Sequence, residues 1–172
     1  MELLDIYDEN RCLTGRTRYR GEPREPGEYG LVVCVWVYDG RGNLLLTRRA
    51  PEKSFPGTWE NSGGAAQAGE DSRTAIAREL WEETGIRADR EEFEQLASTR
   101  DGNNFFDHYC LRREIPLDQI KLLPGETDDV QWATFSQVHE LIEQRQICEI
   151  IAQQFLHEEP ELLKRQDRQN TN

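Results

Sequence analysis

The feature that most constrains this chain is residues 64–86, where a loop rich in glycine and alanine leads into an amphipathic helix pattern. The helix pattern begins at Ser72, where Asp71 or Ser72 itself can accept hydrogen bonds from free N–H groups of the first turn. Gly85 stands where a left-handed residue commonly ends a helix. Apolar residues four positions apart share one face of this helix, so we expect it to pack on a sheet.

The last turns of this helix carry Glu79, Glu82 and Glu83, which is unfavourable for a helix standing alone. The C-terminal end of a helix dipole favours cations by about 0.3–1 kcal/mol per group. Glu79 and Glu83 are also like charges one turn apart, which costs about 0.2–0.5 kcal/mol more. Arg78, one turn before Glu82, offsets part of this cost. Two interpretations stand at this point: a solvated acidic face, or a cation bound among the carboxylates.

The loop before the helix adds a further acid, Glu70, so this segment can gather its carboxylates around one spot. Mg²⁺ and Mn²⁺ take oxygen ligands and usually keep water and substrate phosphates in their remaining positions. A backbone carbonyl near Gly64 could add a neutral ligand, and a bound cation would reverse the repulsion among the acids. The sequence therefore predicts a divalent-metal site, with Mg²⁺ or Mn²⁺ as the cofactor.

The same segment resembles a known family. Its defining positions are Gly64, Glu70, the run Arg78-Glu79-Leu80, the pair Glu82-Glu83 and the pair Gly85-Ile86. This spacing matches the Nudix box at every defined position, which is far more specific than a short isolated motif. The resemblance implies an α/β protein with the Nudix fold, an α/β/α sandwich with a mixed β-sheet. It also implies metal-dependent attack of water on a diphosphate linked to another group.

Carried over by position, the resemblance gives the polar residues of the box their roles. Glu79, Glu82 and Glu83 would bind the metal or handle the attacking water, and the choice of general base among them stays open. Glu70 would support the metal site, and Arg78 would orient the helix carboxylates.

Residues outside the box complete the predicted site. Many Nudix enzymes carry a further acid in a late loop, and Glu126 stands in such a region as a catalytic candidate, with a solvated acidic loop as the alternative. Arg48 and Arg49 end the expected strand 43–49, where loops build binding sites, so either is a candidate for binding the substrate diphosphate. Lys53 is a further candidate, and a plain surface role is the alternative for these cations.

A second group of cations, Arg16, Arg18 and Arg20, alternates along the N-terminal segment. Alternating residues lie on one side of an extended strand. Solvated charges on an edge strand are one interpretation of this stripe, and contact with a substrate phosphate is the other.

The remaining pattern predicts a single domain over residues 1–159 with an N-terminal strand extension, followed by a polar, frayed tail over 160–172. Strands are expected at 3–9, 31–38, 43–49, 93–99, 105–112 and 130–134, with 31–38 and 43–49 forming a hairpin. After the box helix, two further helices are expected: one from Ser136 to about 145, and one marked by Ile147, Ile151 and Phe155.

Composition limits the partners. The net charge of −12 argues against nucleic acid or an anionic membrane as a partner, because either would be repelled. The sequence has neither a long apolar stretch nor a basic-then-apolar N-terminus, so a cytoplasmic location is expected. The expected partner is a small-molecule diphosphate substrate, and a homodimer is left open.

Outside the box, the front half of the chain resembles the isopentenyl-diphosphate-isomerase-like subgroup of Nudix proteins. The similar stretches are Asp5–Asn10, Thr14–Gly15, Gly27–Tyr29 and Val35–Val37. An isomerase would need a cysteine and a histidine shortly after Trp59, and the following residues, up to Ala66, include neither. We therefore predict a hydrolase that cleaves the phosphoanhydride bond of a nucleoside diphosphate derivative or a similar metabolite. The alternatives are an isomerase and a non-catalytic Nudix module that binds ligand.

Overall fold

The structure, a computed structural model, describes residues 1–169. Its strands are β1 (Leu3–Tyr7), β2 (Leu13–Tyr19), β3 (Gly30–Tyr38), β4 (Asn43–Arg49), β5 (Trp59–Glu60), β6 (Ser62–Ala65), β7 (Glu94–Asp101), β8 (Asn104–Arg112) and β9 (Thr127–Thr134). Its helices are α1 (Ser72–Thr84), α2 (Phe135–Glu143) and α3 (Glu149–Gln169), with short 3₁₀ turns η1 (Arg90–Glu92) and η2 (Leu117–Gln119).

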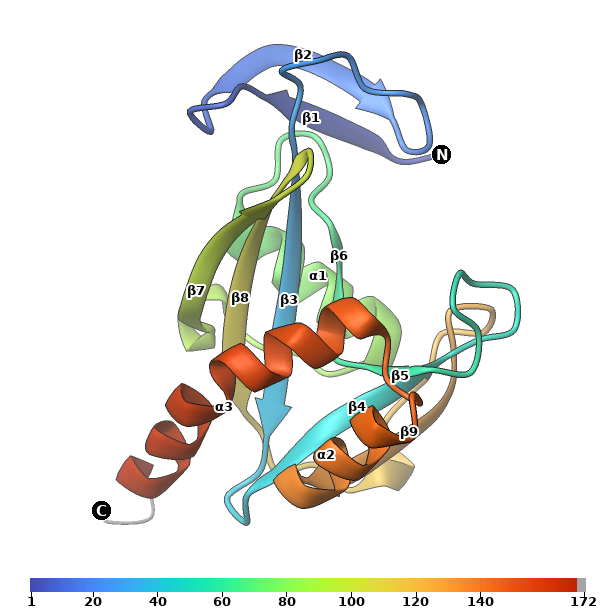
Figure 1. Cartoon of the computed structure of the whole chain (residues 1–172), viewed down its shortest axis with the longest axis vertical. Helices are drawn as coiled ribbons and strands as arrows, with labels where there is room; N and C mark the ends of the chain where they lie inside the picture. Colours follow the sequence, from blue (N-terminus) through green and yellow to red (C-terminus); the bar gives the residue numbers. More distant parts are fainter. Residues whose placement is uncertain (170–172) are drawn as a thin grey trace.

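Strand β3 is the centre of a mixed seven-stranded sheet, flanked by parallel β8 and antiparallel β6. Its side chains alternate between two cores: Val33 and Val35 pack with α1, whereas Trp36 and Tyr38 pack with α2 and α3. Figure 1 shows α1 behind this strand and α3 in front of it. Because both faces are covered, the strand is apolar along its whole length, and the expected α/β/α layering is present.

The expected hairpin between residues 31–38 and 43–49 differs from the structure. β3 and β4 share only the pair Tyr38 and Leu44, and β4 instead pairs with β9 from Asn43 to Arg49. The reason is that both edges of β3 are already occupied by β6 and β8. As a result β4, β5 and β9 diverge from the other strands of the sheet (Figure 1).

The N-terminal strand extension is a separate two-stranded sheet, which we call the hairpin lobe (residues 1–22, containing β1 and β2). It stands at one end of the molecule in Figure 1. Paired backbone hydrogen bonds of 2.9 Å join Tyr7 to Tyr29, and Arg11 forms an ion pair with the buried Asp107 on β8. The lobe is therefore attached to the main sheet at defined points.

The C-terminal region also differs from the expected frayed tail. α3 continues through Pro160 to Gln169, and residues 170–172 lie outside the described part of the chain. Leu162 lies two turns after Phe155 on the same buried face, so the apolar period continues across the proline. Glu158 on α3 is buried against β8, where it pairs with His108 at 2.6 Å.

Helix α2 begins at Phe135, and its cap is Thr134 instead of the expected Ser136. Thr134 caps it by accepting a hydrogen bond from the Gln137 N–H at 3.2 Å, and Gln137 bonds back to Thr134 N–H at 2.8 Å. This reciprocal pair satisfies two free donors, which Ser136 cannot do from inside the first turn. No helix within residues 1–169 is long and apolar enough to cross a membrane.

We predict that Leu162→Ala lowers the free energy of unfolding by about 2–5 kcal/mol, because it opens a cavity beneath α3. Leu163→Ala, at the exposed neighbouring position, is the matched control and should stay within about 0.5 kcal/mol of the wild type. Urea unfolding followed by circular dichroism measures both. Equal stabilities for the two variants would contradict the packing of α3 beyond Pro160.

Candidate functional site

The acidic end of α1 is held rigidly by local structure. Asp71 accepts a hydrogen bond from the Thr74 N–H at 2.8 Å, and Gly85 ends the helix in the left-handed region at φ +72°. Ile76 and Leu80 are fully buried against β3, which fixes the rotation of the helix. The expected cap, stop and buried face are confirmed, so the glutamates of the last turns occupy defined positions.

Arg78 is the centre of the carboxylate cluster. Its Nε and Nη2 donate to both oxygens of Glu70 at 2.8 and 2.9 Å, and its Nη1 donates to Glu79 and Glu82 at 3.0 Å each. Nη2 also donates to the carbonyl of Ala65 on β6 at 3.1 Å. Burial alone would lower the pKa of the Arg78 guanidinium, but these carboxylates outweigh it and raise that pKa. A single guanidinium thus links the loop, the strand and the helix.

Glu70 acts on the cluster through this arginine. Besides Arg78, it accepts a hydrogen bond from the N–H of Gln67 at 2.9 Å. Burial raises the pKa of Glu70, but the bonds from Arg78 and Gln67 outweigh burial and lower it. Its carboxylate is therefore a charged anchor for Arg78.

Gly64 on β6 lies directly against Glu79. A Cβ atom at this position would clash with the Glu79 carboxylate, so any larger residue would displace that side chain. Glu79 is buried, and burial raises its pKa although the Arg78 guanidinium acts in the opposite direction. The glycine of the motif therefore sets how closely the helix carboxylate approaches the strand.

Glu83 has the least compensated carboxylate of the cluster. Its Oε2 is buried and has no hydrogen-bond partner in the structure. Burial, and then the nearby charges of Glu60 and Glu79, raise the pKa of Glu83 well above its usual range. Hydrogen bonds from Ser62 and from the Gly63 N–H act in the opposite direction without compensating. An unpaired buried carboxylate oxygen is costly, and a bound cation would satisfy it.

A cavity of about 160 Å³ lies at this end of α1. The glutamates that line it are Glu2, Glu60, Glu79, Glu82, Glu83 and Glu126, and the cations are Arg20, Arg49 and Lys53. The sequence predicted the three helix glutamates, Glu126, Arg49 and Lys53, and the structure brings these together. Gly64 also lines the cavity, whereas Glu70 and Arg78 stand behind the helix carboxylates.

Two of the three predicted substrate cations face this cavity. Arg49 Nη1 donates to Glu60 at 2.6 Å, and Lys53 pairs with Glu126. Arg48 is directed elsewhere: it pairs with Asp128 at 2.7 Å and lies over the ring of Trp59. Of this pair, Arg49 therefore lines the cavity and Arg48 does not.

The sequence did not indicate Glu2 or Glu60 as site residues. For Arg20 it left two interpretations, a solvated charge or a contact with substrate phosphate. Glu60 lies on β5, directly before the strand that carries Gly64, and burial raises its pKa. Glu2 and Arg20 come from the hairpin lobe. The alternating stripe pointed to Arg20, whereas no sequence signal pointed to Glu2 or Glu60.

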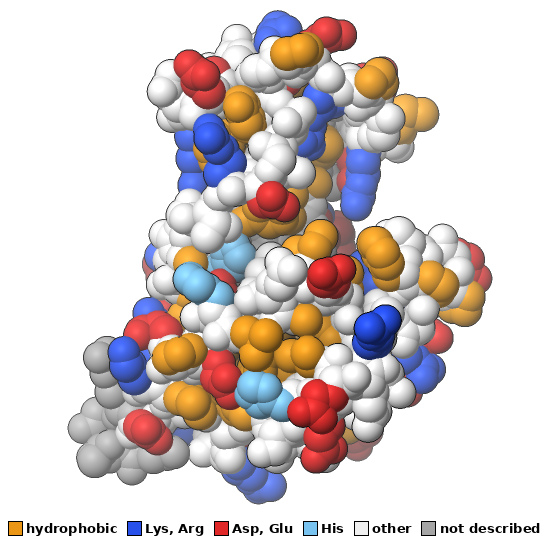
Figure 2. Space-filling model, viewed as in Figure 1, with side chains coloured by type: hydrophobic (Ala, Val, Ile, Leu, Met, Phe, Trp, Pro, Cys, Tyr) orange, Lys and Arg blue, Asp and Glu red, His pale blue; other side chains and the backbone are white. Residues whose placement is uncertain are grey.

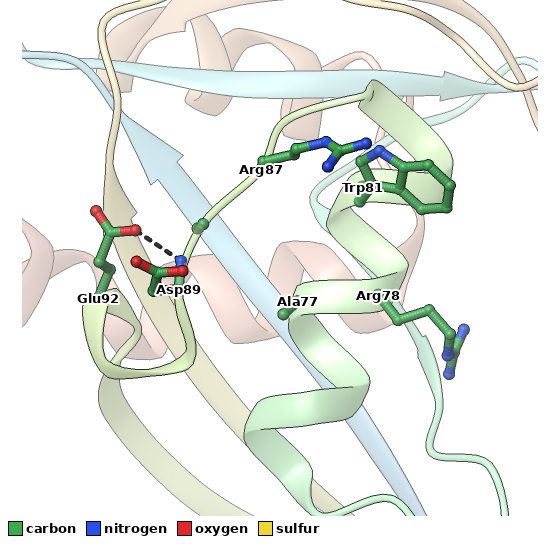
Figure 3. A pocket seen from close by; sticks show the side chains of 7 residues that line it. Ala77, Arg78, Trp81, Arg87, Asp89 and Glu92 are labelled. Atoms are coloured by element: carbon green, nitrogen blue, oxygen red, sulfur yellow. Dashed lines mark hydrogen bonds between the residues drawn. The ribbon is translucent and has the colours of Figure 1, made fainter.

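A larger hollow of about 590 Å³ lies beside α1 at η1, and none of the α1 glutamates lines it. Figure 3 shows that the Arg78 side chain points away from the loop carrying Asp89 and Glu92, while Arg87 extends toward Trp81. The guanidinium of Arg87 lies 5.6 Å from the Trp81 ring centroid. This hollow therefore does not include the glutamates that make up the predicted metal site.

The donor set of the smaller cavity suits a hard divalent cation, because all of its acidic groups offer oxygen. Within residues 1–169, no group of three His, Cys, Asp or Glu side chains is already arranged around a metal position. Glu79 and Glu82 are instead tied to Arg78. Binding a metal would require these carboxylates to turn toward Glu83, whose free oxygen already lacks a partner.

Comparison with known proteins decides the family. The NUDIX domain model matches residues 28–153, which include the whole cluster on α1 as well as Arg49 and Lys53. The chain belongs to the Nudix family. It is 34% identical over 143 residues to an uncharacterized Nudix hydrolase of Listeria monocytogenes, covering 82% of this chain and 85% of the relative.

Solved structures show that this Nudix chain has the expected fold. A crystal structure from Deinococcus radiodurans superposes with a TM-score of 0.77 at 24% identity, covering 91% of this chain and 99% of that one. A second neighbour is a bifunctional NMN adenylyltransferase/ADP ribose pyrophosphatase from Francisella tularensis, solved with AMP and Mn ion. Its TM-score is 0.63 at 22% identity, and the match covers 82% of this chain and 43% of that one. The predicted α/β Nudix fold with a mixed sheet is confirmed.

The likeness to isomerases is narrower. An isopentenyl-diphosphate Delta-isomerase of Streptomyces coelicolor is 35% identical over 86 residues, which is 49% of this chain and 44% of that protein. This match is partial and does not establish the isomerase-like subgroup.

We predict that Glu83→Gln raises the melting temperature of the metal-free protein at pH 8 by at least about 2–4 °C, the effect of roughly 1 kcal/mol in a chain of this size. The folded-state pKa of Glu83 lies above its unfolded value, so the wild type loses stability as pH rises through that folded-state pKa. The gain should vanish near pH 4, where the carboxyl is protonated in both states.

Differential scanning calorimetry in EDTA measures this effect. Glu82→Gln is the control, because the Glu82 carboxylate is partly exposed and already paired with Arg78. A Glu83→Gln protein that melts at or below the wild-type temperature at pH 8 would contradict the claim that the buried, ionised Glu83 destabilises the metal-free fold.

Proposed function

We propose that this protein is a metal-dependent Nudix hydrolase that cleaves the phosphoanhydride bond of a nucleoside diphosphate derivative or a similar diphosphate metabolite. The observation that carries the proposal is that the carboxylates of α1 share one cavity with Arg49 and Lys53. Carboxylates suit a divalent cation, and the cations suit the phosphate oxygens of the substrate. The curated relatives and structural neighbours that are hydrolases or pyrophosphatases support the same reaction class.

Glu79, Glu82 and Glu83 would hold Mg²⁺ or Mn²⁺, with the Gly64 carbonyl as a neutral ligand. The buried, unpartnered Oε2 of Glu83 and the close approach of Glu79 to Gly64 fit this assignment. When bound, the metal supplies charge that neutralises diphosphate oxygens and lowers the pKa of a coordinated water. Glu70 supports the ligands only through Arg78.

The chain's own cations orient the substrate. Arg49 and Lys53 would exchange Glu60 and Glu126 for phosphate oxygens. Water then attacks phosphorus, the bond to the bridging oxygen breaks, and one proton of the water passes to a carboxylate. Glu79, Glu82, Glu83 and Glu126 all line the cavity as candidates for that base.

The size of the cavity bears on the substrate. Pockets that enclose a whole drug-sized ligand measure about 300–1,000 Å³, and this cavity measures about 160 Å³. It therefore suits the phosphate groups, and the rest of the substrate would lie outside it. This is consistent with a diphosphate linked to a larger group.

An isomerase is the second candidate, favoured by the partial match to the Streptomyces coelicolor enzyme. Such a reaction adds and removes a proton on carbon, for which isomerases of this kind use a cysteine and a histidine. Among the described residues, neither residue type lines the cavity. The glutamates that line the cavity favour hydrolysis over both isomerisation and a non-catalytic binding role. We also propose a cytoplasmic location for the enzyme.

We predict Mg²⁺-dependent release of phosphate products from at least one compound in a panel containing ADP-ribose, nucleoside diphosphates and a prenyl diphosphate. Glu79→Gln should lower kcat by about 100-fold or more, because it removes a candidate ligand and base. Glu91→Gln, an exposed glutamate on η1, is the control and should keep wild-type kcat. Double-bond migration in the prenyl diphosphate, or tight binding without turnover, would overturn the hydrolase.

A further inference from the structure

We propose that the hairpin lobe supplies Arg20 as a further phosphate-binding cation, which acts together with Arg49 and Lys53. The inference rests on the proposed diphosphate hydrolase and deepens it, because it assigns substrate recognition to a segment before the matched domain at residues 28–153. Arg20 is a positioning residue for the substrate and takes no part in proton transfer.

The arginine stripe of the N-terminal segment divides in the structure. Arg16 and Arg18 both turn to Glu28, at 2.7 and 3.6 Å, and neither lines the cavity. Arg20, directly after the end of β2, does line it. Contact with substrate phosphate, one of the two interpretations of these arginines, therefore applies to Arg20 alone among the three.

The partner of Arg20 is weakly held. Arg20 Nη1 donates to Glu2 Oε2 at 2.7 Å, and the two side chains are 54% and 34% exposed. Ion pairs exposed to this degree contribute little stability, so an incoming anion can replace the carboxylate. The backbone bond from the Arg20 N–H to the Glu2 carbonyl, at 2.9 Å, keeps the arginine in place during such an exchange.

The same arrangement occurs at each cation of the cavity. Arg49 pairs with Glu60, Lys53 pairs with Glu126, and Arg20 pairs with Glu2. Each cation is thus paired with a glutamate that also lines the wall, and each can exchange it for a phosphate oxygen. The hydrogen bond to Glu2 and the charges of Glu79 and Glu126 raise the pKa of Arg20.

The hairpin lobe is positioned by the Nudix box itself. The Ala68 N–H donates to the Leu3 carbonyl at 2.8 Å, and the Gly69 N–H donates to Asp5 at 2.7 Å. These bonds join β1 to the loop that carries Glu70. Figure 2 shows a notch between the hairpin lobe and the part of the main body that carries the loop after β4, with basic side chains along the lower edge of the lobe.

The test is calorimetric titration with methylenediphosphonate, a diphosphate analogue with a carbon bridge, in the presence of Mg²⁺. Arg20→Ala should weaken its affinity about 10-fold or more, because a charged hydrogen bond to phosphate is lost. Arg16→Ala, on the same side of the same segment, should stay within about twofold of the wild type. Thermal melts of both variants check that the fold is kept.

A double-mutant cycle separates contact from general charge effects. Glu2→Gln should tighten binding in the wild-type background, because it frees Arg20. In the Arg20→Ala background the gain should disappear, whereas a general change of charge would persist there.

The outcomes are distinct. Unchanged affinity in Arg20→Ala, or an equal loss in Arg16→Ala, would overturn the role of Arg20 and leave the hydrolase standing if the wild type binds and turns over substrate. A wild-type protein that neither binds the analogue nor hydrolyses any diphosphate would overturn the proposed function and this inference together.

Discussion

The site depends on one interaction, the guanidinium of Arg78 held among Glu70, Glu79 and Glu82. Glutamates gathered at the C-terminal end of a helix repel one another and oppose the helix dipole. Arg78 neutralises part of that charge and fixes the loop, the strand and the helix relative to one another. It leaves Glu83 without a cation, so the remaining imbalance is concentrated on one buried carboxylate.

The wall of the cavity is a set of ion pairs that can be exchanged. Its cations are already paired with glutamates, which reduces the repulsion among the acids before any ligand binds. In our account, a metal binds Glu79, Glu82 and Glu83, and a diphosphate binds Arg20, Arg49 and Lys53. The opposite charges of the metal and the diphosphate then favour each other's binding. This reciprocity follows from linkage, because each ligand binds better to the arrangement that the other stabilises. The overall charge of −12 makes such local cations necessary for an anionic substrate.

Local features of the site could be read from the sequence. The cap at Asp71, the stop at Gly85 and the helical spacing of the glutamates are short-range patterns, and they placed α1 correctly. Glu2 and Glu60 could not be found, because they reach the cavity only through long-range strand pairing. Similarly, the pairing of β4 with β9 instead of β3 was not predictable, because it depends on which strands occupy the edges of β3. The fold class followed from the Nudix box. Which of Arg48 and Arg49 lines the cavity could be decided only from the directions of their side chains in the structure.

The most direct test of this account is an anomalous difference map from crystals grown with Mn²⁺. The account predicts a peak bounded by the carboxylates of Glu79, Glu82 and Glu83 and the Gly64 carbonyl, with Glu83 Oε2 as a ligand and Arg78 still bound to Glu70. A map without a peak in this cavity at saturating Mn²⁺, with Glu79 and Glu82 still tied to Arg78, would contradict it.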